Sequence, residues 1–258
     1  HPSLAQEICD FLGLPLGKSE TIRFSNENIM VKIHENVREE DVFVIQSSCT
    51  PVSEGIIELF IMIDALKHAS ARRITAVLPY LPYARSDKKD QPRISITARL
   101  MADLLETAGA HRVITMDLHS PQIQGFFRIP VDHLHALPII CDHLSSRSLE
   151  NFVLVASDAG EAKDVGRFAS RLHLPMAIID KRRKGNDEKP EPYNLIGEVK
   201  GKNVLLVDDE ISTGATIISG LDFLFKHGAK EAMAACTHPV LCGPAIDRIS
   251  DSRLSQVV

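Results

Sequence analysis

Short runs of β-branched and apolar residues alternate along the chain with longer amphipathic windows, and this alternation restricts the fold more than any other feature. The order is typical of parallel sheets whose strands are joined by helices on both faces. Predicted strands cover residues 41–46, 73–78, 112–116, 152–156, 176–179, 203–207 and 231–235. Predicted helices cover residues 54–70, 94–108, 161–172 and 216–227. The pattern therefore indicates an α/β chain.

The strands and helices form two series with the same order of elements. Gly109-Ala110 with His119 ten residues after the glycine matches Gly228-Ala229 with His238 ten residues after the glycine. Each pattern spans a helix end, a strand and the loop beyond it. Two Gly-Ala pairs are weak evidence alone, but the shared order of elements favours a duplicated domain.

We therefore expect two similar domains, each a mostly parallel sheet with helices on both faces. The junction is expected within residues 128–150, with one domain over residues 1–135 and the other over residues 136–258. The sequence opens at His1 without a methionine and stops on an apolar Val257-Val258 pair. We interpret both ends as trimmed and the second domain as truncated at its end.

Composition excludes several classes of protein. The 258 residues are 44% hydrophobic, enough for each domain to bury a core. Lys and Arg number 29 against 34 Asp and Glu, so the net charge of −5 predicts no nucleic-acid partner. No apolar run approaches the roughly 20 residues that a bilayer requires, so we expect no membrane partner. Five scattered cysteines without a CxxC pair predict reduced thiols and a cytoplasmic protein.

The most informative motif is an apolar strand that ends in paired carboxylates and enters a turn of small residues. It reads Val204-Leu-Leu-Val-Asp208-Asp209-Glu210-Ile211-Ser212-Thr213-Gly214-Ala215-Thr216. Backbone N–H groups at the start of the next helix, with nearby hydroxyls, would form a cradle for phosphate. The motif lacks the Walker lysine. The carboxylates can accept hydrogen bonds from ribose hydroxyls or hold Mg²⁺, so the motif suggests a sugar phosphate. The alternative is that Asp209 and Ser212 merely cap the helix.

This motif resembles the phosphoribosyl-diphosphate-binding signature of the phosphoribosyltransferase superfamily. The whole chain is similar, in order, to the ribose-phosphate pyrophosphokinase family. The blocks that carry the resemblance are residues 82–90, 116–119, 122–127, 157–160, 180–183 and 237–239. The resemblance implies an enzyme that transfers the diphosphate of ATP to the C1 hydroxyl of ribose 5-phosphate. The products are AMP and phosphoribosyl pyrophosphate for nucleotide biosynthesis, and the implied cofactor is Mg²⁺.

A basic stretch follows the predicted strand 176–179 and reads as a flap that closes over a triphosphate. Cations on such a flap can neutralise charge that develops on a transferring phosphoryl group. The resemblance makes Lys181 and Arg183 catalytic. Without it, the basic residues 181–184 would be interpreted as a solvated loop or a nucleic-acid-binding patch.

The resemblance assigns ribose 5-phosphate binding to one set of residues near the double aspartate. They are Arg183, Asp208, Asp209, Ser212, Thr213, Gly214, Ala215 and Thr216. It assigns the metal to His119 and Asp158, which each follow a predicted strand and suit a Mg²⁺ completed by ATP oxygens. No ligand role is given to His111, His133, His135, His143 or His238.

ATP binding is implied for two segments of the first domain. One is a predicted hairpin turn with Phe24, Asn26, Glu27 and Asn28, and the other is the loop with Arg85, Ser86 and Asp87. In the family the hairpin reaches the ATP site of an adjacent subunit. The resemblance therefore implies a homo-oligomer, a hexamer by family likeness. Taken alone, Phe24 would be interpreted as a core residue.

Four positions depart from the usual family residues. Ser212 stands where Asp is usual, Ser86 where Gln is usual and Asn28 where Glu is usual. Ser212 still offers a hydroxyl to a phosphate, so we expect binding to survive. The other two changes bear on nucleotide recognition. Ala215 replaces a usual Gly, so the turn must accept a Cβ.

Two alternatives differ in class from an active synthase. One is a non-catalytic regulatory paralogue with the same fold, against which the retained Lys181, His119 and Asp158 argue. The other is a phosphoribosyltransferase that consumes the product. That enzyme would have one α/β domain and a hood over its base, whereas this sequence shows two similar halves.

Overall fold

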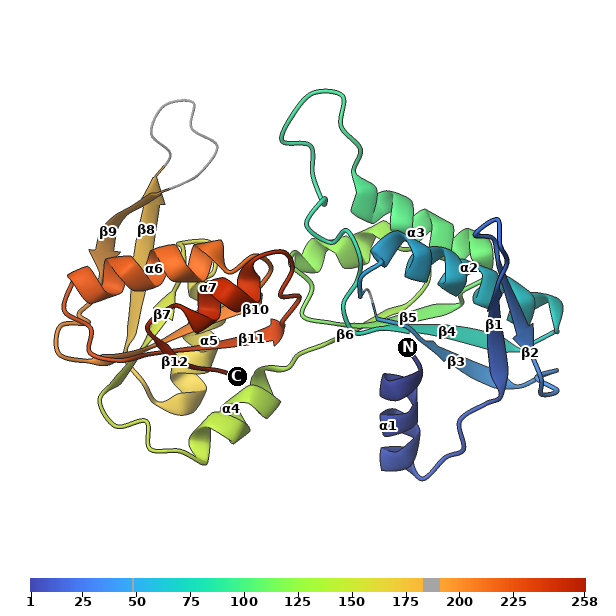
Figure 1. Cartoon of the computed structure of the whole chain (residues 1–258), viewed down its shortest axis with the longest axis horizontal. Helices are drawn as coiled ribbons and strands as arrows, with labels where there is room; N and C mark the ends of the chain where they lie inside the picture. The colour runs from blue at the N-terminus through green and yellow to red at the C-terminus, as the bar shows by residue number, and fades with distance from the viewer. Residues whose placement is uncertain (48, 183–190) are drawn as a thin grey trace. The chain divides into compact units, whose positions relative to one another are not determined.

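The computed structural model describes residues 1–47, 49–182 and 191–258. The chain forms two compact units, His1–His135 and Ala136–Val258, each with its own hydrophobic core (Figure 1). Each unit is an α/β structure with mainly parallel strands, as the sequence predicts.

Unit 1 contains a four-stranded parallel sheet with the spatial order β3-β4-β5-β6. The strands are β3 (Asp41–Ile45), β4 (Arg73–Leu78), β5 (Arg112–Met116) and β6 (Val131–Leu134). They are joined in turn by α2 (Val52–His68), α3 (Thr97–Ala108) and the 3₁₀ helix η1 (Pro121–Phe126). The unit also contains α1 (Pro2–Leu12) and a separate antiparallel hairpin of β1 (Ser19–Arg23) and β2 (Ile29–Ile33).

The helices α2 and α3 share one face of this sheet (Figure 1). Each connection between these parallel strands is a right-handed crossover, and each steps to the next strand in the same direction across the sheet. The connecting helices therefore lie on the same face. Ile63 of α2 and Ile74 of β4 are fully buried in the core between these layers. Helix α1 instead contacts β3 at the edge of the sheet.

Unit 2 contains a six-stranded sheet with the spatial order β12-β11-β10-β7-β8-β9, in which only β9 is antiparallel to its neighbour among the described pairs. The strands are β7 (Phe152–Ala156), β8 (Met176–Arg182), β9 (Glu191–Ile196), β10 (Asn203–Glu210), β11 (Ala232–His238) and β12 (Leu254–Val257). The helices are α4 (Leu137–Ser145), α5 (Ala162–Leu172), α6 (Ala215–Lys226) and α7 (Ala245–Ser250).

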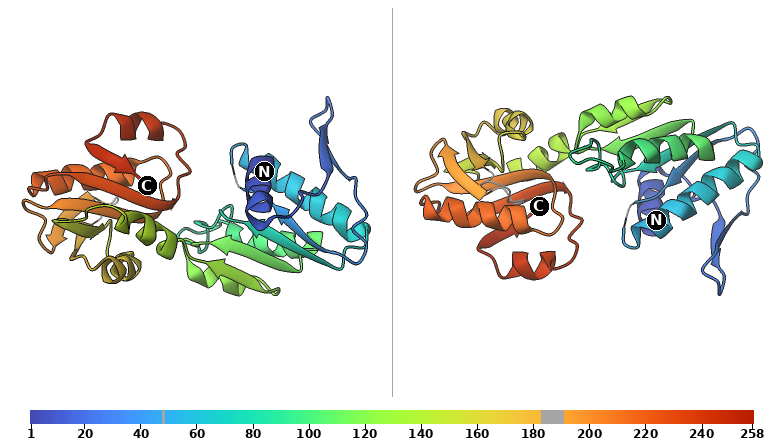
Figure 2. Two further views of the ribbon diagram at one scale, coloured as in Figure 1. Left: turned by 90° about the horizontal axis from the view of Figure 1, so that it is seen from below. Right: turned by 90° about the horizontal axis from the view of Figure 1, so that it is seen from above.

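The strand order of unit 2 reverses between β10 and β7. The chain steps from β7 to β8 in one direction and from β10 to β11 in the other, so right-handed crossovers place α5 and α6 on opposite faces. Figure 2 shows these two helices on either side of the sheet. A reversal of this kind opens a crevice at the carboxyl ends of the two strands, which is where ligands of such sheets bind.

The two Gly-Ala pairs end equivalent helices in the two units. Gly109 follows α3 with φ 122° and Gly228 follows α6 with φ 88°, a region that suits glycine. In each pair the alanine N–H donates to a carbonyl five residues earlier, Ala110 to Leu105 and Ala229 to Leu224. The repeat seen in the sequence therefore corresponds to a repeated helix end before a strand.

Several elements differ from their predicted bounds. Strand β10 continues to Glu210 rather than ending at residue 207, because β11 pairs with it as far as His238. Strand β8 continues to Arg182 because the unpredicted strand β9 pairs with it. The predicted junction, residues 128–150, contains β6, which completes the first sheet, and α4. Within the part of the chain that the structure describes, no helix is both long and apolar enough to span a bilayer.

Candidate active site

Acidic residues gather at the carboxyl edge of the unit 2 sheet, beside the reversal of strand order. Asp208 and Asp209 are the sixth and seventh residues of β10, and Asp208 pairs with Cys236 of β11. Ser157 and Asp158 directly follow β7, whose last residue, Ala156, pairs with Val207. Because the two strands are parallel neighbours, their carboxylates lie at one edge of the sheet.

Burial and mutual repulsion strongly raise the pKa values of two carboxyl groups at this edge, those of Asp208 and Glu161. Burial, with the charge of Glu161 next in size, raises the pKa of Asp208 to about 9. Burial, with the charge of Asp158 next in size, raises the pKa of Glu161 to about 7. The positive charge of Lys181 offsets part of the rise at Glu161. Such shifts are typical of sites where a cation or a hydrogen-bond donor binds.

Glu161 is an acidic residue of this edge to which we assigned no role from the sequence. Its Oε2 accepts hydrogen bonds from the backbone N–H of Ser157 (3.1 Å) and from the Ser157 hydroxyl (2.8 Å). In return, Asp158 Oδ1 accepts from the N–H groups of Gly160 (2.8 Å) and Glu161 (3.2 Å). These reciprocal bonds fix the loop between β7 and α5. An acidic residue three positions after Asp158, just before an amphipathic helix, is the capping signal that could have identified it.

The loop from Ser212 to Gly214 leads from β10 into α6. Gly214 has φ 73° and is the N-cap of α6, so the residue at the N-cap position has no side chain with which to cap the helix. Neither Asp209 nor Ser212 therefore stands at the N-cap position. The N–H groups of the first helical turn have no acceptor within the helix, so they can bind an anion.

Ala215 is the first residue of α6, and the left-handed conformation falls on Gly214 instead. The departure from the usual family glycine thus places a Cβ where ordinary helical backbone accepts one. Thr213, Ala215 and Thr216 are exposed, whereas Gly214 is buried.

Lys181 lies on β8, next to β7 in the sheet, and its side chain is half-buried. Because Ile178 pairs with Ala156, the last residue of β7, Lys181 lies further along β8 at the same carboxyl edge as the acidic residues. Arg183, to which we assigned a catalytic and a ribose-phosphate role, lies outside the described residues, as do the other residues of the predicted flap up to residue 190.

In unit 1 the loop after β4 is tied to the start of α3. Ser86 donates from its N–H to the carbonyl of Tyr83 (2.9 Å), and its own carbonyl accepts from the N–H of Ala98 (3.1 Å). The Ser86 hydroxyl lies 3.4 Å from the Thr97 hydroxyl. Arg85 is exposed and Asp87 is half-buried. The short side chain at position 86 therefore packs within unit 1 and holds this loop against α3.

The predicted hairpin is the antiparallel pair β1 and β2, with Phe24, Asn26, Glu27 and Asn28 in its turn. The Asn26 side chain accepts from the Asn28 N–H (3.2 Å), and Glu27 has φ 67°. Phe24 is 48% exposed, so its interpretation as a core residue is wrong.

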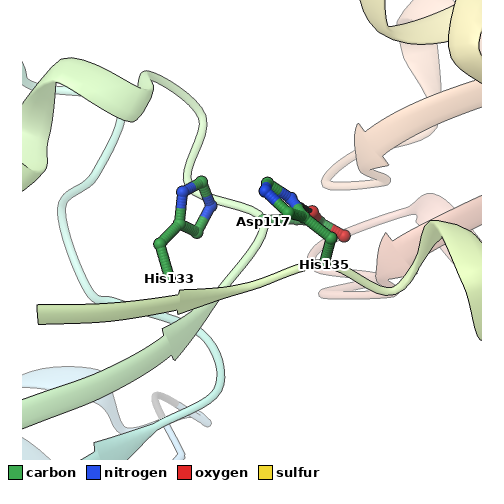
Figure 3. Close-up of side chains that lie close together, drawn as sticks. All are labelled: Asp117, His133 and His135. Atoms are coloured by element: carbon green, nitrogen blue, oxygen red, sulfur yellow. Dashed lines mark hydrogen bonds and ion pairs between the residues drawn. The ribbon is translucent and has the colours of Figure 1, made fainter.

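His119 is exposed on the loop after β5, and three other side chains near the carboxyl ends of β5 and β6 lie together. Figure 3 shows these three, Asp117, His133 and His135. His135 Nδ1 is 2.9 Å from Asp117 Oδ1. His133 Nε2 accepts from the Leu118 N–H (2.9 Å), and its Nδ1 lies 3.2 Å from Gln124 Nε2. A metal at His133 would have to break one of these contacts.

The structure brings together Lys181 and the described residues assigned to ribose 5-phosphate, at one edge of unit 2, whereas Arg183 lies outside the described residues. The residues assigned to ATP lie in unit 1. Of the two metal ligands implied by the resemblance, His119 belongs to unit 1 and Asp158 belongs to unit 2.

The fold and the β10–α6 loop define a class of protein. Residues 130–258 match the phosphoribosyl transferase domain, and residues 1–109 match the N-terminal domain of ribose phosphate pyrophosphokinase. The second unit thus has the phosphoribosyltransferase fold. The match of residues 1–109 narrows the class to proteins that also contain the N-terminal domain of ribose phosphate pyrophosphokinase.

Similar proteins agree with this assignment. A ribose-phosphate pyrophosphokinase of Bacillus caldolyticus is 52% identical over 255 residues, which are 99% of this chain and 81% of that protein. One from Bacillus subtilis (strain 168) is 48% identical over 258 residues, 100% of this chain and 81% of that protein. The crystal structure of phosphoribosylpyrophosphate synthetase from Mycobacterium smegmatis superposes with a TM-score of 0.93 at 41% identity, covering 100% of this chain and 84% of that one. The chain belongs to the ribose-phosphate pyrophosphokinase family.

Proposed function

We propose that this chain is an active ribose-phosphate diphosphokinase. The C1 hydroxyl oxygen of ribose 5-phosphate attacks the β-phosphorus of ATP, and the bond from that phosphorus to the α,β-bridging oxygen breaks. AMP leaves, the hydroxyl proton is lost, and phosphoribosyl pyrophosphate forms. The observation that carries this proposal is the double aspartate of β10 beside an uncapped helix end, in a chain of this family.

We assign ribose 5-phosphate to the edge of unit 2. Asp208 and Asp209 accept hydrogen bonds from the ribose hydroxyls. The N–H groups of the loop Ser212–Gly214 and of the first turn of α6 bind the 5-phosphate, with the hydroxyls of Ser212, Thr213 and Thr216. The residue types support the assignment, because carboxylates suit hydroxyl donors and helix N–H groups suit an anion.

We assign Mg²⁺ to His119 and Asp158. A carboxylate and one imidazole suit a hard cation that takes its other ligands from substrate phosphates and water. In Asp158 the Oδ1 atom already accepts two backbone hydrogen bonds, so Oδ2 is the oxygen assigned to the metal. The ion would supply positive charge that neutralises the phosphates.

Lys181 is the catalytic cation of this proposal, with Arg183 as its neighbour on the ribose-phosphate side. The half-buried ammonium of Lys181 sits at the same edge as the acidic residues and can move its charge toward the transferring group. Stabilising charge that develops during phosphoryl transfer is the main contribution a protein makes to this chemistry.

We assign ATP to Arg85, Ser86 and Asp87 and to the hairpin turn of an adjacent subunit, so the active form is a homo-oligomer, with a hexamer expected by family likeness. The exposed Phe24 suits stacking on adenine. An apolar group at the end of α1, with Phe11 90% exposed and Leu12 and Leu14 also exposed, supports self-association, because a neighbouring copy can cover it.

All five cysteines are free thiols, which supports a reducing compartment, and we propose the cytoplasm.

The experiment that tests the proposal measures AMP release from ATP with Mg²⁺, in the presence and absence of ribose 5-phosphate. We expect release that depends on ribose 5-phosphate and that yields phosphoribosyl pyrophosphate. An oligomer without turnover would identify a silent paralogue. Consumption of added phosphoribosyl pyrophosphate in the presence of a free base would identify a phosphoribosyltransferase.

Lys181→Ala tests the catalytic cation. We expect AMP formation to fall by at least about 100-fold, since a lost electrostatic contact to the transferring group has an effect of this size. Assembly, measured by light scattering, should be unchanged. Lys226→Ala, which removes an exposed lysine at the far end of α6, is the matched control. Equal turnover in wild type and Lys181→Ala would remove Lys181 from the mechanism.

A further inference from the structure

The segment between β11 and α7 runs alongside the loop Ser212–Gly214. Ile211 donates its N–H to the carbonyl of His238 (3.0 Å), and the carbonyl of Ile211 accepts from the N–H of Leu241 (3.0 Å). The carbonyl of Ser212 accepts from the N–H of Cys242 (3.0 Å). The loop is therefore paired, residue by residue, with a segment to which we assigned no role.

Arg248 of α7 continues this pairing by one residue. Its Nη1 donates to the carbonyl of Thr213 (3.0 Å). Three successive carbonyls are thus held, those of Ile211 and Ser212 by this segment and that of Thr213 by the helix that follows it. In a trans peptide the C=O and the following N–H point in opposite directions. The N–H groups of Ser212, Thr213 and Gly214 are consequently turned away from this segment, as a row of donors of the kind that binds anions.

The side chain of Cys242 makes a further contact with the loop. Its Sγ lies 3.1 Å from Oγ of Ser212, at a half-buried position. A hydroxyl has one hydrogen to donate, and a phosphate oxygen without a proton only accepts. When Ser212 donates to a phosphate, the remaining partner must donate to Ser212 Oγ, and the thiol of Cys242 is placed to do so. The contact then directs the hydroxyl hydrogen toward the ligand.

We propose that Cys242 and Arg248 are positioning residues for ribose 5-phosphate: they orient the hydroxyl of Ser212 and the peptide between Thr213 and Gly214 from outside the site. The inference rests on the assignment of the 5-phosphate to this loop. Neither residue touches the substrate. Arg248 fixes the orientation of the peptide between Thr213 and Gly214, and Cys242 fixes the direction of the Ser212 hydroxyl hydrogen.

The role predicts a selective effect on one substrate. We expect Cys242→Ala to raise the KM for ribose 5-phosphate by about 3-fold to 10-fold, the size of one lost neutral hydrogen bond, and Arg248→Ala to raise it by about 10-fold. The KM for ATP should stay within about twofold, and so should kcat at saturation. Cys242→Ser, which keeps a donor at this position, should restore the wild-type KM. Asp247→Asn, at an exposed position on the same helix, is the matched control.

A double-mutant comparison separates positioning from general stability. If Cys242 acts through Ser212, then Cys242→Ala should change ribose 5-phosphate affinity in the wild type but not in a Ser212→Ala background. Affinity is measured by calorimetry on the full chain, and thermal unfolding of each variant is recorded. Equal effects of Cys242→Ala in both backgrounds would overturn the proposal for Cys242, and so would failure of Cys242→Ser to rescue.

The outcomes also distinguish this inference from the site assignment. If Ser212→Ala leaves ribose 5-phosphate affinity unchanged, the 5-phosphate does not bind at this loop and the site assignment fails first. If Ser212→Ala weakens binding while Cys242→Ala and Arg248→Ala do not, the site stands and the positioning roles are overturned. Should Arg248→Ala unfold, Arg248→Met keeps a long side chain without a donor, and an unchanged KM for ribose 5-phosphate in it would exclude a role for the guanidinium contact.

Discussion

Asp208 is a half-buried carboxyl group whose charge is coupled to that of a second acidic residue, Glu161. Burial and this neighbour raise the pKa of Asp208 to about 9, so the group keeps its proton at neutral pH in the free protein. Ribose hydroxyls and a nearby cation both favour the charged form. Ligand binding therefore supplies the favourable partners for a charged Asp208 that the free protein lacks. Without a ligand, this carboxyl group lowers the stability of the folded state at neutral pH.

The raised pKa predicts how stability depends on pH. In the unfolded chain Asp208 loses its proton near its ordinary pKa of 3.8, whereas in the folded chain it keeps the proton up to about pH 9. Between these values the folded state binds the extra proton. Asp208 therefore lowers the free energy of unfolding as pH rises, by up to about 1.4 kcal/mol per pH unit.

Asp208→Asn removes this dependence, so its stability relative to the wild type should increase from pH 6 to pH 8.5. Hydrogen exchange of β10 peptides at the two pH values measures the effect. Asp222→Asn, an exposed carboxyl on α6, is the control and should show no such trend. A difference between wild type and Asp208→Asn that does not vary with pH would contradict the raised pKa.

The elements of the site could largely be predicted from the sequence, and the misses have physical causes. A buried apolar run was enough to identify β10 as a strand, but its last three acidic residues argue against a strand locally, and only pairing with β11 extends it. Strand β9 was missed because it begins with Glu191-Pro192 and lies at the sheet edge, the one place where a proline fits. Glu161 was missed because its partner Ser157 lies in a loop whose shape periodicity does not predict.

The start of α6 depends on one glycine. Gly214 has φ 73°, and a Cβ built there would meet its nearest neighbours only at 3.7 Å or more, so space is available and the conformation alone resists a side chain. We expect Gly214→Ala to lower the free energy of unfolding by about 1–2 kcal/mol and to raise the KM for ribose 5-phosphate, since the first-turn N–H groups shift.

Gly166→Ala provides the contrast in the same unit. Gly166 lies inside α5, has no positive φ, and a Cβ there meets nothing within 4 Å. This variant should raise the free energy of unfolding by up to about 1 kcal/mol. Chemical denaturation of both variants gives the comparison, and a change of the same sign in the two would show that the glycine conformation at the α6 start is not the limiting factor.

At the scale of the whole molecule, the described chain has two main sheets, each with its own core, and the separate two-stranded hairpin of β1 and β2. The alternation of strands and helices predicted this class, and the repeated Gly-Ala pairs correspond to equivalent helix ends. The sequence did not reveal that the strand order runs in one direction in the first sheet and reverses in the second, because topology depends on which strands pair across the fold. That reversal is what locates the acidic edge beside β7 and β10.

Separate cores predict separate local stabilities. Ile63 is fully buried in the first core and Leu206 is 1% exposed in the second. Truncation of either side chain to alanine should cost about 2–5 kcal/mol. We expect native-state hydrogen exchange to accelerate in unit 1 for Ile63→Ala and in unit 2 for Leu206→Ala. Equal acceleration in both units from a single substitution would mean that the two cores open as one cooperative body.

The pairing of β8 with β9 shifts its register between Asp180 and Lys181. The extra residue is Tyr193 of β9, because Asp180 pairs with Asn194 and Lys181 pairs with Pro192. Side chains alternate from one side of a strand to the other, so the extra residue resets the alternation on β9 and leaves that of β8 unbroken. An engineer who transplants this lysine together with its partner strand must therefore keep the extra residue of β9, because its removal would change which β9 residue pairs with Lys181.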